Sequence, residues 1–115
     1  MLVRIVGLGP GDPDLLTLGS LDALRATGRA VALLAPPELT KYLGANGVEI
    51  LRHVVADPAL LVRGSVEACA AFVAHAAQSS GDIALGVLGN PLSDFPGLPP
   101  VLRGLEVAGI ATQIV

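Results

Sequence analysis

The sequence opens with Met-Leu-Val-Arg-Ile-Val-Gly-Leu-Gly-Pro-Gly-Asp-Pro-Asp, residues 1–14, in which an apolar, β-branched run breaks into a turn rich in glycine and proline. Residues 2–8 are interrupted only by Arg4, and such a short apolar run is typical of a strand buried on both faces of a parallel sheet. Glycine permits positive φ angles and close approach of a ligand to the backbone, whereas proline fixes φ. We therefore expect the turn to form a rigid loop that presents its backbone to a ligand.

The rest of the chain alternates strand-like apolar runs with helical patterns. Strands are predicted over residues 30–35, 48–51, 82–88 and 110–115, and helices over residues 17–28, 38–43, 65–80 and 99–109. We expect Thr17 and Ser65 to cap the helices that they begin, and Gly28, Gly44 and Gly109 to end theirs. Strands that alternate with helices form right-handed βαβ units, so the predicted fold is α/β, a three-layer α/β/α sandwich with a five-stranded parallel sheet. Ligands bind such sheets beyond the carboxyl ends of the strands.

The composition limits the classes of function. The chain has 115 residues, enough for one domain. Its net charge of −3 means that it has no excess of basic residues to neutralise phosphates, so we expect no binding to nucleic acid. No apolar run approaches the ~18 residues that span a bilayer, and the start lacks a signal-peptide pattern, which predicts a cytoplasmic protein away from membranes. A hydrophobic content of 52% with 15% charged residues indicates apolar surface covered by another subunit or domain, and we expect a homodimer.

Several kinds of site are disfavoured by the residues present. Asp12 occupies the third glycine position of a dinucleotide-binding G-x-G-x-x-G motif, and the only lysine, Lys41, is not part of a phosphate-binding loop. The residues Cys69, His53 and His75 are too scattered for a zinc site, so neither a metal ligand nor a catalytic side chain is predicted. What remains is a site that binds its ligand through backbone groups and through the shape of its loops. Methyl transfer from a sulfonium suits it, because such chemistry depends on positioning.

The two glycine and proline turns together resemble those of the tetrapyrrole (corrin/porphyrin) methylase family. Residues 6–18, Val-Gly-Leu-Gly-Pro-Gly-Asp-Pro-Asp-Leu-Leu-Thr-Leu, are similar to the opening motif of that family, and Gly89-Asn90-Pro91 stands where the family usually has Gly-Asp-Pro. Residues 37–49 are most similar to the branch in which such a domain is fused to a MazG-type nucleoside triphosphate pyrophosphohydrolase. The resemblance implies that residues 1–115 are the first of two α/β domains, with the first and fourth strands side by side and the second domain absent from this chain.

The resemblance also implies a function. It predicts a domain of an S-adenosylmethionine-dependent methyltransferase that is incomplete alone and acts on a small molecule of the tetrapyrrole kind. The substrate-binding residues that it implies are Pro10, Gly11 and Asp12, and the residues that it implies for S-adenosylmethionine are Gly9, Pro10, Gly89, Asn90 and Pro91. Asn90 replaces the usual aspartate, which weakens electrostatic contact with the cationic donor. The second strand lacks the Tyr-Asp-x-Leu-Val pattern of porphyrinogen methylases.

Two other functions stay open at this point. Residues 89–97, Gly-Asn-Pro-Leu-Ser-Asp-Phe-Pro-Gly, are similar to a turn of the ribosomal-RNA ribose methyltransferases, although the low basic content of the chain disfavours RNA. The domain is alternatively a non-catalytic module of a MazG-type fusion protein, which would bind a ligand or support dimerisation.

Overall fold

Strands and helices alternate along the chain in the computed structural model, which describes residues 1–33, 35–54, 63–94 and 97–115. The elements are β1 (Leu2–Gly7), η1 (Pro13–Leu15), α1 (Leu18–Thr27), β2 (Arg29–Leu33), α2 (Pro37–Ala45), β3 (Glu49–Val54), α3 (Arg63–Ser80), β4 (Ile83–Val87), α4 (Pro91–Asp94), α5 (Leu98–Val107) and β5 (Ala111–Ile114). All five predicted strands are therefore present.

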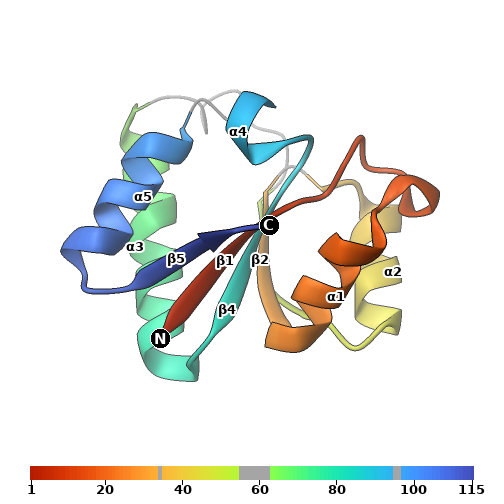
Figure 1. Cartoon of the computed structure of the whole chain (residues 1–115), viewed down its shortest axis with the longest axis horizontal. Helices are drawn as coiled ribbons and strands as arrows, with labels where there is room; N and C mark the ends of the chain where they lie inside the picture. Colours follow the sequence, from red (N-terminus) through yellow and green to blue (C-terminus); the bar gives the residue numbers. More distant parts are fainter. Residues whose placement is uncertain (34, 55–62, 95–96) are drawn as a thin grey trace.

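The strands form one parallel sheet in the order β3-β2-β4-β1-β5. Helices α1 and α2 lie on one side of this sheet, and α3 and α5 lie on the other (Figure 1). The predicted three-layer α/β fold is confirmed. Strand β1 pairs with β4 along its length, from Val3 opposite Ile83 to Gly7 opposite Val87, as the family resemblance implied. The carboxyl ends of these two strands therefore lie next to each other.

Strand β1 contributes side chains to the core on both faces of the sheet, which explains its nearly continuous apolar sequence. Val3 and Ile5 pack with residues of α3 and α5. Val6 and Leu8, which is the residue after the strand, pack on the opposite side with residues of α1 and α2. All four side chains are fully buried. The prediction of a strand buried on both faces is confirmed, and β1 is an interior strand.

The ends of α1 lie where the sequence predicts them. The Thr17 hydroxyl oxygen accepts a hydrogen bond from the Ser20 backbone N–H at 3.1 Å, which satisfies one of the free amides of the first turn. Gly28 ends the helix in the left-handed conformation, with φ of 72°, which glycine adopts without steric cost. Both ends of this helix can therefore be predicted from a few consecutive residues of the sequence.

Two other helix boundaries, and the turn after β4, differ from the predictions. Helix α2 continues past Gly44 to Ala45, because the left-handed turn that leads into β3 occurs at Gly47, with φ of 85°. Helix α3 begins at Arg63, so Ser65 lies inside its first turn and is not the cap. A short helix, α4, interrupts the turn after β4 and was not predicted. None of the helices in the described part of the chain is long and apolar enough to cross a membrane.

Strand β5 forms one edge of the sheet and pairs only with β1. All four of its residues are exposed, in contrast to the five buried residues of β4. The backbone N–H of Val115 still donates to the Ile5 carbonyl at 2.9 Å. This pairing extends the strand register to the residue that borders the site described below.

A first prediction concerns the packing of α1, which positions one side of that site. Leu24 is fully buried beneath this helix, so Leu24→Ala removes apolar contacts and leaves a cavity, at a cost of about 2–5 kcal/mol in the free energy of unfolding. Leu18→Ala is the matched control, because Leu18 lies in the same helix and is 80% exposed. Urea unfolding followed by circular dichroism measures both, and an equal loss in the two variants would contradict the packing described here.

Candidate functional site

The turns that follow β1 and β4 are joined by a backbone hydrogen bond. The Gly89 N–H donates to the Gly9 carbonyl at 2.7 Å, and the two residues form an isolated antiparallel bridge. Both have positive φ angles, +66° at Gly9 and +81° at Gly89, a conformation that side chains make costly. The two segments are about eighty residues apart in sequence, and this contact fixes their backbones against each other.

Two further glycines allow these turns to pack closely. A Cβ atom on Gly7 would lie 3.0 Å from the Gly89 carbonyl oxygen and 3.1 Å from Cδ of Pro91. A Cβ atom on Gly11, where φ is +103°, would lie 2.9 Å from Cγ of Pro36. Gly7 therefore lets the turn after β4 approach β1, and Gly11 lets the first turn pack against the segment after β2.

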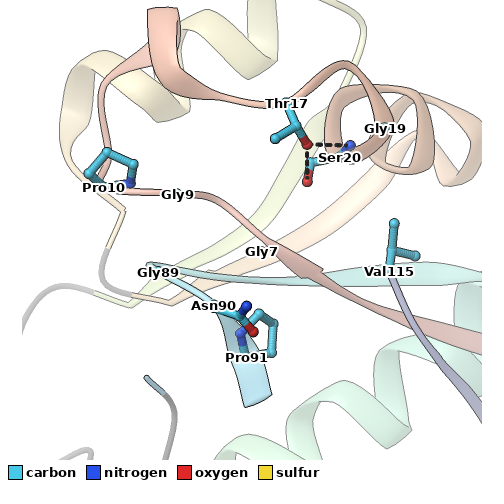
Figure 2. A pocket seen from close by; sticks show the side chains of 10 residues that line it. All are labelled: Gly7, Gly9, Pro10, Thr17, Gly19, Ser20, Gly89, Asn90, Pro91 and Val115. Carbon is cyan, nitrogen blue, oxygen red and sulfur yellow. Dashed lines mark hydrogen bonds between the residues drawn. The ribbon is translucent and has the colours of Figure 1, made fainter. Parts of the chain in front are cut away.

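A pocket of about 710 Å³ lies beyond the carboxyl ends of β1 and β4 (Figure 2). Its lining residues come from the end of β1 and its turn, the start of α1, the turn after β4, and the residue after β5; they are Gly7, Gly9, Pro10, Thr17, Gly19, Ser20, Gly89, Asn90, Pro91 and Val115. The volume lies within the range of roughly 300–1,000 Å³ that is typical of small-molecule sites. The location is the one expected for ligands of parallel α/β sheets.

The pocket gathers every residue that the family resemblance implied for S-adenosylmethionine. Those residues are Gly9, Pro10, Gly89, Asn90 and Pro91. Gly11 and Asp12, implied for the substrate along with Pro10, do not line it. Gly11 is buried, whereas Asp12 is exposed and its Oδ1 accepts a hydrogen bond from the Asp14 N–H at 2.9 Å. This bond caps η1, so the Asp12 carboxylate has a local structural role at the end of the loop.

Other lining residues were not predicted as part of a site. Thr17 was expected only to cap α1, yet its hydroxyl also donates to Oγ of Ser20 at 2.9 Å (Figure 2). Ser20 is only 8% exposed. The capping signal at Thr17 could have indicated this wall of the pocket, because a helix that follows a strand in an α/β unit begins at the sheet's carboxyl edge. For Val115 no local signal exists, since only its register beside β1 brings it to the pocket.

No lining residue of the pocket has an ionisable side chain. Its polar side chains are the hydroxyls of Thr17 and Ser20 and the amide of Asn90. The Asn90 Oδ1 accepts a hydrogen bond from the Leu92 N–H at 2.9 Å, which holds the side chain at the start of α4. The lining can therefore orient a ligand through backbone contacts and neutral hydrogen bonds.

Ionisable groups of interest lie elsewhere. Cys69 packs at the margin of the core beneath α3 and α5, where burial raises the pKa of its thiol against the opposing effect of Arg52. Arg52 itself lies over the ring of Phe72, with 4.9 Å between the guanidinium carbon and the ring centre. Among the residues that the structure describes, no group of three or more His, Cys, Asp or Glu side chains is arranged to hold a metal ion.

Comparison with known proteins identifies the family. The profile of the Tetrapyrrole (Corrin/Porphyrin) Methylases matches residues 3–115, and the chain therefore belongs to this family. A search of curated protein sequences returned no match.

Solved structures with the same fold include two of uroporphyrin III C-methyltransferase from Thermus thermophilus. The native form matches with a TM-score of 0.72 and 21% identity over 98% of this chain and 43% of that chain. The complex with S-adenosyl homocysteine matches with a TM-score of 0.71 and 20% identity over the same shares. Cobalt precorrin-4 methyltransferase, a cobalamin biosynthetic enzyme, matches with a TM-score of 0.68 and 23% identity over 99% of this chain and 44% of that chain. The chain thus spans less than half the length of these structures.

A second prediction tests the close approach of the two turns. Gly7→Ala places a methyl group 3.0 Å from a backbone carbonyl that cannot move without breaking the bridge to Gly9, so we expect a loss of about 1–3 kcal/mol in the free energy of unfolding. Gly44→Ala is the control, because its added methyl group meets nothing within 4 Å and alanine is the better helix former by about 1 kcal/mol. Chemical denaturation should therefore move the two variants in opposite directions, and equal stability would contradict the assigned role of Gly7.

Proposed function

We propose that this chain is a domain of an S-adenosylmethionine-dependent methyltransferase, and that its pocket holds part of the methyl donor. The observation that carries the proposal is the pairing of the turns at Gly9 and Gly89, which brings all five residues implied for the donor to one cavity. Membership of the methylase family supports it. So does the shared fold of a methyltransferase that was solved with S-adenosyl homocysteine.

The residues present fit such a donor. Glycines at four lining positions leave the walls to the backbone, and the volume of about 710 Å³ is that of a small-molecule site. The hydroxyls of Thr17 and Ser20 are suited to neutral hydroxyl and amine groups, and the lining presents no cation to a sulfonium. When bound, the donor supplies a methyl group that is already activated, so this domain contributes by orienting the ligand. A general acid or base is not required of these residues.

We propose that a second domain completes the site. Leu18 and Leu92, each next to a lining residue, are 80% and 71% exposed, and apolar surface of this kind marks an interface. In this arrangement the turn of Pro10, Gly11 and Asp12 borders the substrate side through its exposed residues Pro10 and Asp12, with a small molecule as the methyl acceptor. The length of the matched structures supports the same proposal, since the chain covers 43% of the native methyltransferase.

The finer assignments are also proposals. The similarity of residues 37–49 to the MazG-fused branch supports placement of the chain in that branch. The hydrophobic content of 52% supports a homodimer, and a cytoplasmic location is proposed as well.

A third prediction tests donor binding directly. Titration of S-adenosylhomocysteine into the ¹⁵N-labelled chain should produce saturable shifts in the amide resonances of Gly9, Gly89 and Asn90. The amide of Gly44 in α2, which does not line the pocket, serves as the internal control. NMR spectroscopy detects the weak binding expected of half a site and also locates it. Saturable shifts centred on other residues, or none at all, would overturn the proposed donor pocket.

A fourth prediction concerns the charge at position 90. Asn90→Asp keeps an oxygen that can accept from the Leu92 N–H and adds a negative charge beside the cationic donor. Because residue 90 is exposed and exposed charge pairs contribute roughly 0.2–1 kcal/mol, we expect binding of S-adenosylmethionine to strengthen by up to about fivefold. S-adenosylhomocysteine has no sulfonium and should gain less. Calorimetric titration gives the ratio of the two affinities, and an unchanged ratio would remove Asn90 from the donor site.

A further inference from the structure

The first turn of α1 carries hydrogen-bond donors that have no acceptor in the described part of the chain. Thr17, Gly19 and Ser20 all line the pocket, and Figure 2 shows them together at the start of the helix. The backbone N–H groups of Leu18 and Gly19 are the first two of α1, where a helix offers no internal acceptor. Neither group donates a hydrogen bond to a residue that the structure describes.

The hydroxyls of Thr17 and Ser20 supply one more donor. They carry two protons, and the bond from Thr17 to Oγ of Ser20 at 2.9 Å uses one of them. The Ser20 proton then has no acceptor among the described residues. Reversing the bond between the hydroxyls would free the Thr17 proton instead, so one donor remains in either arrangement. Ser20 is only 8% exposed and lines the pocket, so a ligand in the pocket can accept from it.

Gly19 leaves the two backbone amides open to a ligand. It is exposed, and a Cβ atom built on it would meet nothing within 4 Å. Glycine is a poor helix former, and neither a positive φ nor a close contact requires it at this position. Gly7 and Gly11 differ, because a side chain at either would collide with its neighbours. The missing side chain at residue 19 therefore keeps the space beside the start of α1 free within the pocket.

On this basis, and resting on the proposed function, we infer that the first turn of α1 binds a carboxylate of the ligand that occupies the pocket. A carboxylate has lone pairs for all three donors, and the positive end of the helix dipole favours its charge. The hydroxyls alone would suit neutral groups equally well, and the two amides beside them are what select an anion. The exposed carboxylates of Asp14 and Asp22 lie outside the pocket lining, where water and salt screen their repulsion.

A carboxylate can come from either of two ligands. The amino-acid end of S-adenosylmethionine carries one, and the acidic side chains of a tetrapyrrole acceptor carry several. Both ligands present the same group to the same donors. Pairs of ligands that differ in this group distinguish the two sources.

The test combines Ser20→Ala with two such pairs, titrated into the ¹⁵N-labelled chain. S-adenosylhomocysteine is compared with its decarboxylated form, which keeps the amine, and uroporphyrin with its fully amidated, neutral derivative. A hydrogen bond to a charged group is about twice as strong as a neutral one. We therefore expect Ser20→Ala to weaken the carboxylate ligand about tenfold, the amide at most about threefold, and the decarboxylated compound not at all. Ser79→Ala, at an exposed serine near the end of α3, should change none of these affinities.

The outcomes separate this inference from the proposed function. Weakening of S-adenosylhomocysteine assigns the site to the donor, and weakening of uroporphyrin assigns it to the acceptor. Equal losses within each pair, unchanged affinities, or no binding of either carboxylate ligand to the unmodified chain would overturn the inference. Binding of S-adenosylhomocysteine that is insensitive to Ser20→Ala would still leave the donor pocket in place.

A second pair of variants tests the amides while the cap at Thr17 stays intact. Gly19→Leu covers the N–H groups with a side chain, and Gly44→Leu makes the same change in α2, where an added Cβ atom also meets nothing within 4 Å. Leucine is the better helix former, so urea unfolding should find both variants at least as stable as the parent chain. We expect Gly19→Leu alone to weaken the carboxylate ligand, by about tenfold or more. Equal affinities in the two variants would contradict the assigned role of this turn.

Discussion

The hydrogen bond from the Gly89 N–H to the Gly9 carbonyl is the contact on which the candidate site depends. It forms only because β1 and β4 are neighbours in the sheet, so that the turns after them leave the same edge side by side. Gly7 has no Cβ to separate them, and the positive φ angles at Gly9 and Gly89 aim the two backbones at each other. The pocket is thus a consequence of strand order combined with glycine at three positions.

A site made in this way has limited chemical means. Its walls are backbone, proline rings and a few neutral polar groups, and no ionisable side chain stands among the lining residues. Such a lining can bind and orient, and that is what transfer of an activated methyl group requires of it.

The relation to the tetrapyrrole methylases agrees with a pocket that binds and orients a ligand. The family profile covers nearly the whole chain, while identities of 20–23% to the solved methyltransferases show a shared fold. Those structures are more than twice as long as this chain. The leucines beside the pocket, Leu18 and Leu92, are exposed.

Much of the architecture was determined by sequence alone, because its signals are local. The apolar run of β1, the cap at Thr17 and the left-handed stop at Gly28 each depend on a few consecutive residues, and the alternation of strands with helices implied a parallel sheet. The less regular boundaries, at Gly44 and Ser65, were wrong by a few residues because weak signals there compete with tertiary packing. Adjacency of β1 and β4 came only from the family resemblance.

The tertiary structure decided which residues meet. Val115 borders the pocket because β5 pairs with β1. The Asn90 side chain is held at the start of a short helix, α4, which no hydrophobic periodicity in the sequence predicted. Gly11 and Asp12 belong to the recognisable motif, yet one packs against Pro36 and the other caps η1. Sequence patterns report the conformation of neighbouring residues. The composition of a pocket depends on strand order and register, which are set by contacts between residues far apart in the chain.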